Sequence, residues 1–151
     1  MNAVHFTKPF FSLRPIEIKN GGMRYCELIK PLGGLWCSPL DADYGWKDWC
    51  QAQSLGDIEH DQRVIFDVDM SNFVVIDNAE DMKTRLPWFL FVDGHSMAID
   101  FEKIVREGVD GIHLTENGLE ETKFTYPESL NGWDCETILI LNDRCIRSIE
   151  T

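Results

Sequence analysis

Short runs of β-branched and aromatic residues recur along the whole chain, and they restrict its fold more than any other feature. Runs of this kind, separated by turn-forming residues, are typical of strands. They predict strands at Val4–Phe6, Gly34–Cys37, Arg63–Val68, Phe73–Ile76, Gly111–Leu114 and Thr137–Leu141. Because no repeat or linker separates these segments, we expect residues 1–151 to form a single domain around one core.

Three further segments carry apolar residues at the spacing of short helices. They are Tyr44–Ala52, a segment that opens at Asn78, and a segment from Asp100 to Gly108. The second has Met82, Leu86 and Phe89 as its apolar positions, and we expect Pro87 to kink or end it. Asp41 and Asp43 are candidate caps of the first helix, and Asp100 is the candidate cap of the third. Many short strands with a few small helices predict an α+β domain.

The chain is strongly acidic, which narrows the range of partners. It has 26 Asp and Glu against 14 Lys and Arg, a formal net charge of −12. A field of this sign repels nucleic-acid backbones and anionic membrane surfaces. No apolar run approaches the ~18 residues of a membrane span, and residues 1–5 lack the pattern of a signal peptide. We therefore expect a cytoplasmic protein that does not bind membranes.

Several polar groupings suggest metal or nucleophile chemistry only weakly. The five cysteines include no C-x-x-C pair, which favours reduced, buried thiols and no metal site. Asp67-Val68-Asp69 matches the D-x-D of metal-dependent sugar-nucleotide transferases, but alternating acids on a strand are often a solvated face. Glu59-His60-Asp61 and Asp93-Gly94-His95-Ser96 contain residue types found in metal and nucleophile sites. Their spacing does not require such a site, and the usual polarity of loops explains both.

Two segments offer groups for binding an aromatic ligand. His5, on the first predicted strand, is followed by the hydroxyl of Thr7; the alternative is a structural histidine. Gly33 and Gly34 precede the second predicted strand, where the absence of a Cβ lets a ligand approach the backbone. Trp36 and Trp49 then offer flat faces for stacking, and the alternative is that both belong to the core.

A third segment places two acids before an apolar strand. Asp134 and Glu136 are two residues apart, so in an extended strand their side chains share one face. An acid at the edge of a buried strand is partly desolvated, which suits a carboxylate that stabilises a cation or accepts a proton. The alternative is a solvated strand start.

Together the three segments resemble the ADP-ribosyltransferase superfamily, in its branch with a His-Tyr-Glu triad that includes the poly-ADP-ribose polymerases. His5 with Thr7 fits the first-strand motif of that branch. The run from Gly34 to Ser38, with Trp49-Cys50 in the following helix, fits its second motif. Glu136 fits the late glutamate, and Asp134-Cys135-Glu136 is similar to the acid-x-Glu motif of the toxin branch. Trp36 stands where the family has Tyr, so stacking is retained and the hydroxyl is lost.

The resemblance implies a split antiparallel sheet with small flanking helices, and NAD as a substrate. Breaking the nicotinamide–ribose bond develops positive charge on the sugar, as in glycoside hydrolysis. By resemblance, Glu136 is the catalytic carboxylate that stabilises this charge and holds a ribose hydroxyl. Asp134 supports it.

The same resemblance assigns the other contacts. His5 and Trp36 are the main cofactor contacts, with His5 on the adenosine-side ribose. Trp36 and Trp49 flank the nicotinamide ring, backbone groups near His5 or Thr7 bind its amide, and Gly34 allows the close approach. Ser38 orients Glu136, as the serine of the toxin branch does.

The expected activity is mono-ADP-ribosyl transfer from NAD to a macromolecular acceptor, for which a protein is favoured over nucleic acid. Compact solitary transferases of this type resemble toxins or phage and host-conflict effectors, which implies an antitoxin as a partner. Two alternatives stay open: an NAD glycohydrolase, in which water replaces the acceptor, and a non-catalytic acidic binding or inhibitor protein that blocks a basic surface.

Overall fold

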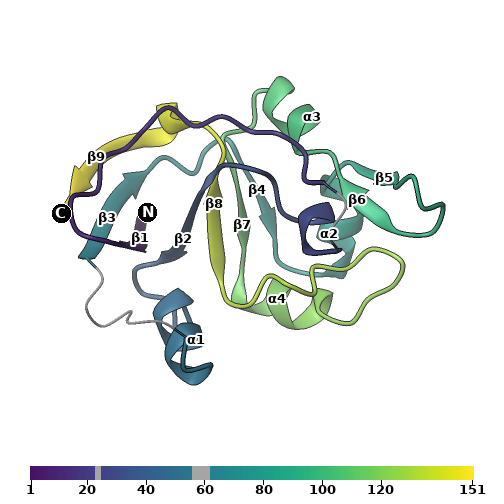
Figure 1. Cartoon of the computed structure of the whole chain (residues 1–151), viewed down its shortest axis with the longest axis horizontal. Coiled ribbons are helices and arrows are strands. Elements are labelled where there is room, and N and C mark those ends of the chain that lie inside the picture. The colour runs from purple at the N-terminus through teal and green to yellow at the C-terminus, as the bar shows by residue number, and fades with distance from the viewer. Residues whose placement is uncertain (23–24, 56–61) are drawn as a thin grey trace.

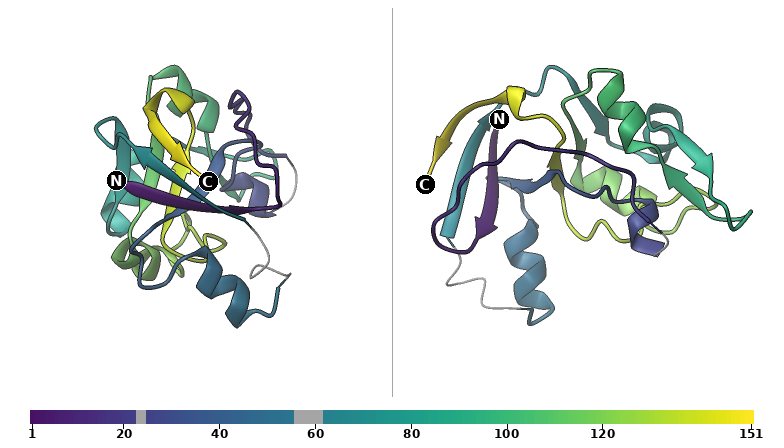
Figure 2. Two further views of the ribbon diagram at one scale, coloured as in Figure 1. Left: turned by 90° about the vertical axis from the view of Figure 1, so that its left-hand side faces the viewer. Right: turned by 45° about the horizontal axis from the view of Figure 1, so that its top comes forward.

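A computed structural model describes residues 1–22, 25–55 and 62–151 of the chain, and its main element is a curled seven-stranded sheet (Figures 1 and 2). The strand order is β4-β7-β8-β2-β1-β3-β9. The strands of this sheet are β1 (Asn2–Thr7), β2 (Leu35–Pro39), β3 (Gln62–Val68), β4 (Phe73–Ile76), β7 (Gly111–Leu114), β8 (Thr137–Ile140) and β9 (Ile146–Glu150). A separate hairpin pairs β5 (Trp88–Leu90) with β6 (Met97–Ile99).

Small helices flank the sheet, so the described residues form a mixed α+β fold. The α-helices are α1 (Trp46–Ala52), α2 (Ala79–Arg85), α3 (Phe101–Arg106) and α4 (Glu116–Thr122), and short 3₁₀ turns cover η1 (Tyr25–Leu28) and η3 (Asp143–Cys145). In Figure 1, α1 and α4 lie at the lower end of the sheet, where the chain enters β8. None of the helices in the described ranges is long and apolar enough to cross a membrane.

The sheet is nearly divided between β1 and β2. These strands pair over only Ala3↔Pro39 and Val4↔Ser38, whereas β1 pairs with β3 along six residues. On its other edge, β2 pairs with β8 from Leu35 to Cys37. Beyond Val4 and Ser38, therefore, β1 follows β3 while β2 follows β8, and the two strands separate.

Two clusters of buried side chains pack on the sheet. One gathers around Trp133, Phe101 and Leu139, with α2, α3 and α4 contributing Met82, Ile104 and Leu119. The other gathers around Phe66, Val64 and Ile138, against which Phe11 and Leu13 of the loop after β1 pack. The sheet is thus covered over parts of both faces.

All six strands predicted from the sequence are present, with bounds within two residues. The three predicted helices also form, but α1 begins after Gly45, whose N–H bonds Asp48, so neither Asp41 nor Asp43 caps it. Leu86 ends α2 in extended backbone before Pro87, which places Phe89 in β5 instead of on the helix. Asp100 caps α3 as expected, and Asn78 caps α2.

The sheet is mixed, which differs from the antiparallel sheet that the resemblance implies. β4 and β7 are parallel, from Phe73↔Gly111 to Ile76↔Leu114. Parallel neighbours need a long crossover connection, and residues 77–110, which include α2, the hairpin and α3, supply it.

We predict that Gly111→Ala destabilises the protein through β7. An added Cβ would lie 2.3 Å from the Phe73 ring and 2.6 Å from the Leu139 carbonyl oxygen. Overpacking of this kind should lower the free energy of unfolding by about 3 kcal/mol. Gly22→Ala is the control, since its Cβ would meet only the flexible Glu27 carboxylate, at 3.2 Å. Urea denaturation measures both, and equal stability of the two variants would contradict the packing described here.

Candidate functional site

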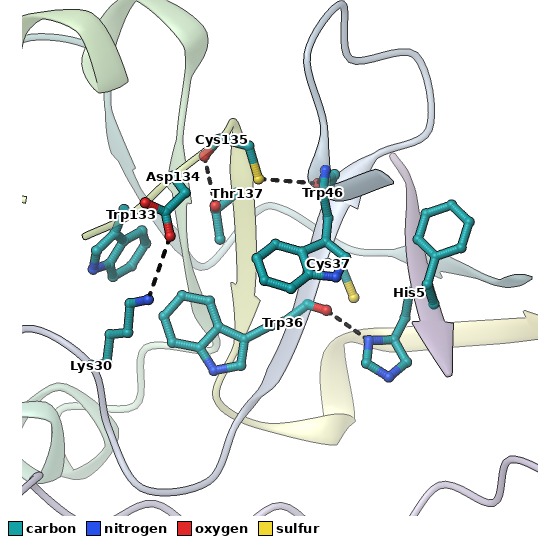
Figure 3. A pocket seen from close by; sticks show the side chains of 11 residues that line it. His5, Lys30, Trp36, Cys37, Trp46, Trp133, Asp134, Cys135 and Thr137 are labelled. Atoms are coloured by element: carbon teal, nitrogen blue, oxygen red, sulfur yellow. Dashed lines mark hydrogen bonds and ion pairs between the residues drawn. The ribbon is translucent and has the colours of Figure 1, made fainter. Parts of the chain in front are cut away.

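A pocket of about 390 Å³ lies where β1 and β2 separate (Figure 3). Indoles, two thiols and a few polar groups surround it. Its lining residues are His5, Phe6, Lys30, Trp36, Cys37, Ser38, Trp46, Trp133, Asp134, Cys135 and Thr137. Concave, mostly apolar sites of this size with a small number of polar groups are typical of small-molecule binding.

Trp36 is fixed in the pocket by a second indole. Its ring packs edge-to-face on Trp133, with centroids 5.1 Å apart and planes at 69°. Trp133 is itself buried, and its Nε1–H donates to the carbonyl oxygen of Ile29 at 2.8 Å. Because Trp133 cannot shift without losing this hydrogen bond, it holds Trp36 in one orientation.

His5 bridges the opening between the two strands. Its Nδ1 lies 2.8 Å from the carbonyl oxygen of Trp36. A carbonyl only accepts hydrogen bonds, so Nδ1 carries the proton and Nε2 of the neutral ring is an acceptor. Nε2 has no hydrogen-bond partner within the part of the chain that the structure describes. A ligand hydroxyl can therefore donate to it.

Lys30 and Asp134 supply the opposite charges of the pocket. The Lys30 Nζ lies 4.0 Å from Asp134 Oδ2 and 5.6 Å from the centroid of the Trp36 ring. Both side chains keep about one third of their surface exposed, at 34% and 32%. Figure 3 shows the two groups meeting beside Trp36 and Trp133.

Ser38 joins the pocket to α1. Its buried Oγ accepts a hydrogen bond from the Trp46 N–H at 2.8 Å and lies 3.8 Å from Cys135 Sγ. Trp46 stacks on Trp49, with centroids 5.0 Å apart and planes at 24°. Ser38 thus positions the first turn of α1 and, through it, Trp46. It makes no contact with Glu136 that would orient the carboxylate, which differs from the role implied by the resemblance.

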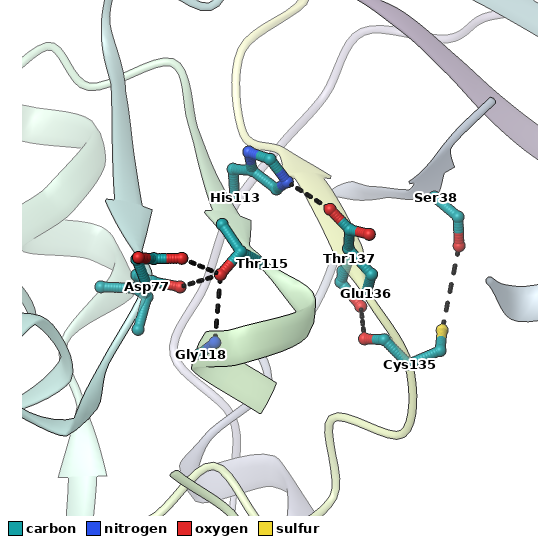
Figure 4. A network of polar contacts seen from close by, with 9 residues as sticks. Ser38, Asp77, His113, Thr115, Gly118, Cys135, Glu136 and Thr137 are labelled. Carbon is teal, nitrogen blue, oxygen red and sulfur yellow. Dashed lines mark hydrogen bonds and ion pairs between the residues drawn. The ribbon is translucent and has the colours of Figure 1, made fainter. Parts of the chain in front are cut away.

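Glu136 is directed away from this pocket. Its Oε1 accepts a hydrogen bond from His113 Nε2 at 3.0 Å (Figure 4). His113 pairs with Ile138, whereas Trp36 pairs with Leu139. Since successive residues of a strand point to opposite faces, the carboxylate of Glu136 and the Trp36 indole lie on opposite faces of the sheet.

The prediction that Asp134 and Glu136 share one face is wrong for a local reason. Strand β8 begins only at Thr137, so the alternation of an extended strand does not apply to these residues. Asp134 turns toward the pocket and Glu136 turns toward His113. The structure therefore brings His5, Trp36, Ser38 and Asp134 together, without Glu136.

Three other predicted ligand-binding residues do not line the pocket. Thr7 lies at the far end of β1, paired with Gln62. Gly34 has φ +84°, a backbone conformation that favours glycine, and an added Cβ would also come within 2.8 Å of Leu139 Cδ1, so local geometry explains this glycine. Trp49 lines a second cavity of about 480 Å³ between α1 and α4, which also includes Tyr44, Gln53, Glu116, Leu119, Glu120, Lys123 and Asp134.

The other acidic motifs have structural partners. Asp69 binds Arg147 at 2.8 Å, and hydrogen bonds from Ser71 are the main cause that lowers its pKa to about 2. Asp93 accepts hydrogen bonds from the backbone of His95 and Ser96 in the turn between β5 and β6. Glu59-His60-Asp61 lies outside the described residues. Within residues 1–22, 25–55 and 62–151, no group of three or more His, Cys, Asp or Glu side chains is placed to hold a metal ion.

Sequence reasoning overlooked Lys30, Trp46 and Trp133 as pocket residues. Lys30 and Trp133 lie close in sequence to Gly34 and Asp134, but nothing in their spacing shows that residues about one hundred positions apart meet. For Trp46 a signal was available. Trp46 and Trp49 are three residues apart in a helix and therefore share a face, so either can reach the pocket.

Comparisons of the chain with protein-family models, with curated proteins and with solved structures give no match. The arrangement of the pocket is therefore the basis for assigning a function.

Three buried thiols should not act as nucleophiles at neutral pH: Cys37 and Cys135 of the pocket and Cys145 of the core. Burial raises the pKa of Cys37 and of Cys135 and raises that of Cys145 to about 11. Because thiolates are the reactive form, we predict that iodoacetamide at pH 7.5 leaves these three residues unmodified in the native protein. The same reagent should label them in urea. Peptide mass spectrometry measures this, and rapid native labelling of Cys135 would contradict the burial of the pocket wall.

Proposed function

We propose that the pocket between β1 and β2 binds NAD and that the protein cleaves the nicotinamide–ribose bond, transferring ADP-ribose to an acceptor. The observation that carries the proposal is the meeting of His5, Trp36 and Asp134 where the sheet opens. These groups come from three distant segments, and each supplies a different kind of contact that this substrate requires.

The indoles suit the nicotinamide ring. In NAD this ring is a planar cation, and a cation over an indole face is favourable by about 0.5–2 kcal/mol, depending on how far it is desolvated. Trp36 already attracts the Lys30 ammonium, at 5.6 Å from its ring centroid. Trp133 packs edge-to-face against Trp36 and supports its ring. His5 Nε2 is an acceptor for a ribose hydroxyl.

Asp134 suits the charge that develops on the ribose. When the C1′–N bond breaks, its electron pair leaves with nicotinamide, which becomes neutral, and the sugar becomes an oxocarbenium-like cation. A fixed carboxylate beside it stabilises the transition state. The acceptor then attacks C1′, and its proton passes to the carboxylate or to water. We assign Asp134 this role in place of Glu136, because Asp134 lines the same pocket as Trp36 and Glu136 does not.

The sheet also supports the proposal. A sheet that divides at its centre is the fold that the ADP-ribosyltransferase resemblance implies, and β1 and β2 share only two paired positions. The resemblance rests on His5, the segment after Gly34 and the acids at residues 134–136. The pocket draws a residue from each of these segments.

The charge of the second cavity suits a protein acceptor better than a nucleic-acid acceptor. Asp134 belongs to both cavities, so a group bound in the second is close to the proposed catalytic carboxylate. Glu116, Glu120 and Asp134 outnumber Lys123 there. This charge disfavours nucleic acid and favours a protein acceptor. An antitoxin partner remains an expectation of the resemblance to toxins and host-conflict effectors.

Release of nicotinamide from NAD tests the proposal. We predict that Asp134→Asn lowers kcat about 100-fold or more, because an electrostatic contact to the transition state is lost. Asp41→Asn is the control, since it removes one exposed acid outside the pocket. Glu136→Gln should retain most of the activity. Loss of activity in Glu136→Gln with full activity in Asp134→Asn would contradict the assignment of Asp134, and an inactive wild-type protein would contradict the proposal itself.

Labelled NAD separates transfer from hydrolysis. With the wild-type protein and a cell lysate, we predict that the adenylate label becomes attached to material that protease digests and nuclease does not. Asp134→Asn is the control. Release of free ADP-ribose at the same rate with and without lysate would identify the protein as a glycohydrolase instead.

A further inference from the structure

The Lys30 ammonium lies between two groups of the pocket that attract cations. One side of it faces the Trp36 ring at 5.6 Å, and the other faces the Asp134 carboxylate at 4.0 Å (Figure 3). Under the proposed function these are the same two groups that attract the nicotinamide ring and the charged ribose. Lys30 and the substrate therefore compete for one place.

The contacts of Lys30 are easy to exchange. A separation of 4.0 Å is at the limit of an ion pair, and both partners are about one third exposed. Pairs of this kind contribute little to stability. Lysine carries its charge on a flexible four-carbon chain with three rotatable donors. The ammonium can thus move without unfolding the pocket wall.

The substrate also needs a cation that the rest of the pocket does not supply. NAD carries two negative phosphates, and the protein has a formal net charge of −12. Of the described residues that line the pocket, Lys30 alone is a lysine or an arginine. An ammonium is a strong hydrogen-bond donor to phosphate oxygens.

We propose that Lys30 fills the cation subsite between Trp36 and Asp134 in the free protein and moves to the diphosphate when the nicotinamide ring takes its place. This inference rests on the proposed function and names the feature that selects the substrate. A ligand must bring both a cation to replace the ammonium and an anion to receive it. The exchange leaves no carboxylate or ammonium of the pocket without a partner.

Lys30→Met provides a test with two opposite effects. The variant keeps the length of the side chain and removes its charge. Calorimetry should show that NAD binds at least about tenfold more weakly to it, because a charge-assisted contact to phosphate is lost. N-methylnicotinamide, a cation without phosphate, should bind about threefold more tightly, because nothing competes for the Trp36 face.

Two further variants test whether the change in affinity comes from the charge of Lys30 and not from the loss of any surface charge. Lys47→Met removes an exposed charge from α1, outside this pocket, and should change neither affinity. Lys30→Arg keeps the cation and should bind NAD like the wild-type protein, which also provides a folded variant if Lys30→Met is unstable.

The outcomes separate the two proposals. If wild-type protein binds NAD, and Lys30→Met changes both affinities in the same direction or changes neither, the exchange is wrong while the proposed function stands. If Lys30→Arg loses NAD as Lys30→Met does, the charge of Lys30 is not what binds the diphosphate, and the exchange is likewise wrong. If wild-type protein binds neither NAD nor N-methylnicotinamide, both proposals are wrong.

Discussion

The short pairing between β1 and β2 is the constraint on which the rest of the site depends. Two paired positions keep the sheet continuous, and beyond Val4 and Ser38 each strand follows its other neighbour. Backbone groups at such an opening need partners other than the adjacent strand. The His5 imidazole meets this need by donating to the Trp36 carbonyl oxygen. The same hydrogen bond fixes which ring nitrogen of His5 remains available to a ligand.

The aromatic wall of the pocket is continuous with the hydrophobic core. Trp133 is both a core residue and a pocket residue, and its indole N–H is bound to Ile29. Rigid support from buried neighbours is what a binding site requires to hold its groups in place. Trp46 gains comparable support from Ser38 and from stacking on Trp49. The polar groups Lys30 and Asp134, in contrast, are about one third exposed and are joined by a separation of 4.0 Å.

The fold was predictable where local pattern and burial agree. The runs at Phe73–Ile76 and Gly111–Leu114 are strands with the predicted bounds, because the second is fully buried and the first is partly buried beside it. Strand β9 was not predicted, because it is an edge strand whose charged residues, such as Arg147 and Glu150, break the apolar pattern of a buried strand. Helix α4 was not predicted, because it contains Gly118 and glycine is typical of turns. An added Cβ there would meet the Ile76 carbonyl oxygen at 2.1 Å, so close packing explains this glycine.

The site was predictable in part. Sequence reasoning chose His5, Trp36, Ser38 and Asp134, which do meet, but assigned catalysis to Glu136. That choice assumed that residues 134–136 belong to an extended strand, whereas the strand begins at Thr137. Contacts between distant residues, such as Lys30 with Asp134, depend on how the whole chain folds. A local pattern in one sequence does not predict them.

The central claim is that the opening between β1 and β2 is a nucleotide-binding site. Titration of ¹⁵N-indole-labelled protein with NAD tests it most directly, since the five tryptophans report on different parts of the molecule. The account predicts that the indole signals of Trp36, Trp46 and Trp133 shift together, whereas that of Trp88 in β5 does not. A titration that moves Trp88 alone, or that moves no indole signal, would contradict it.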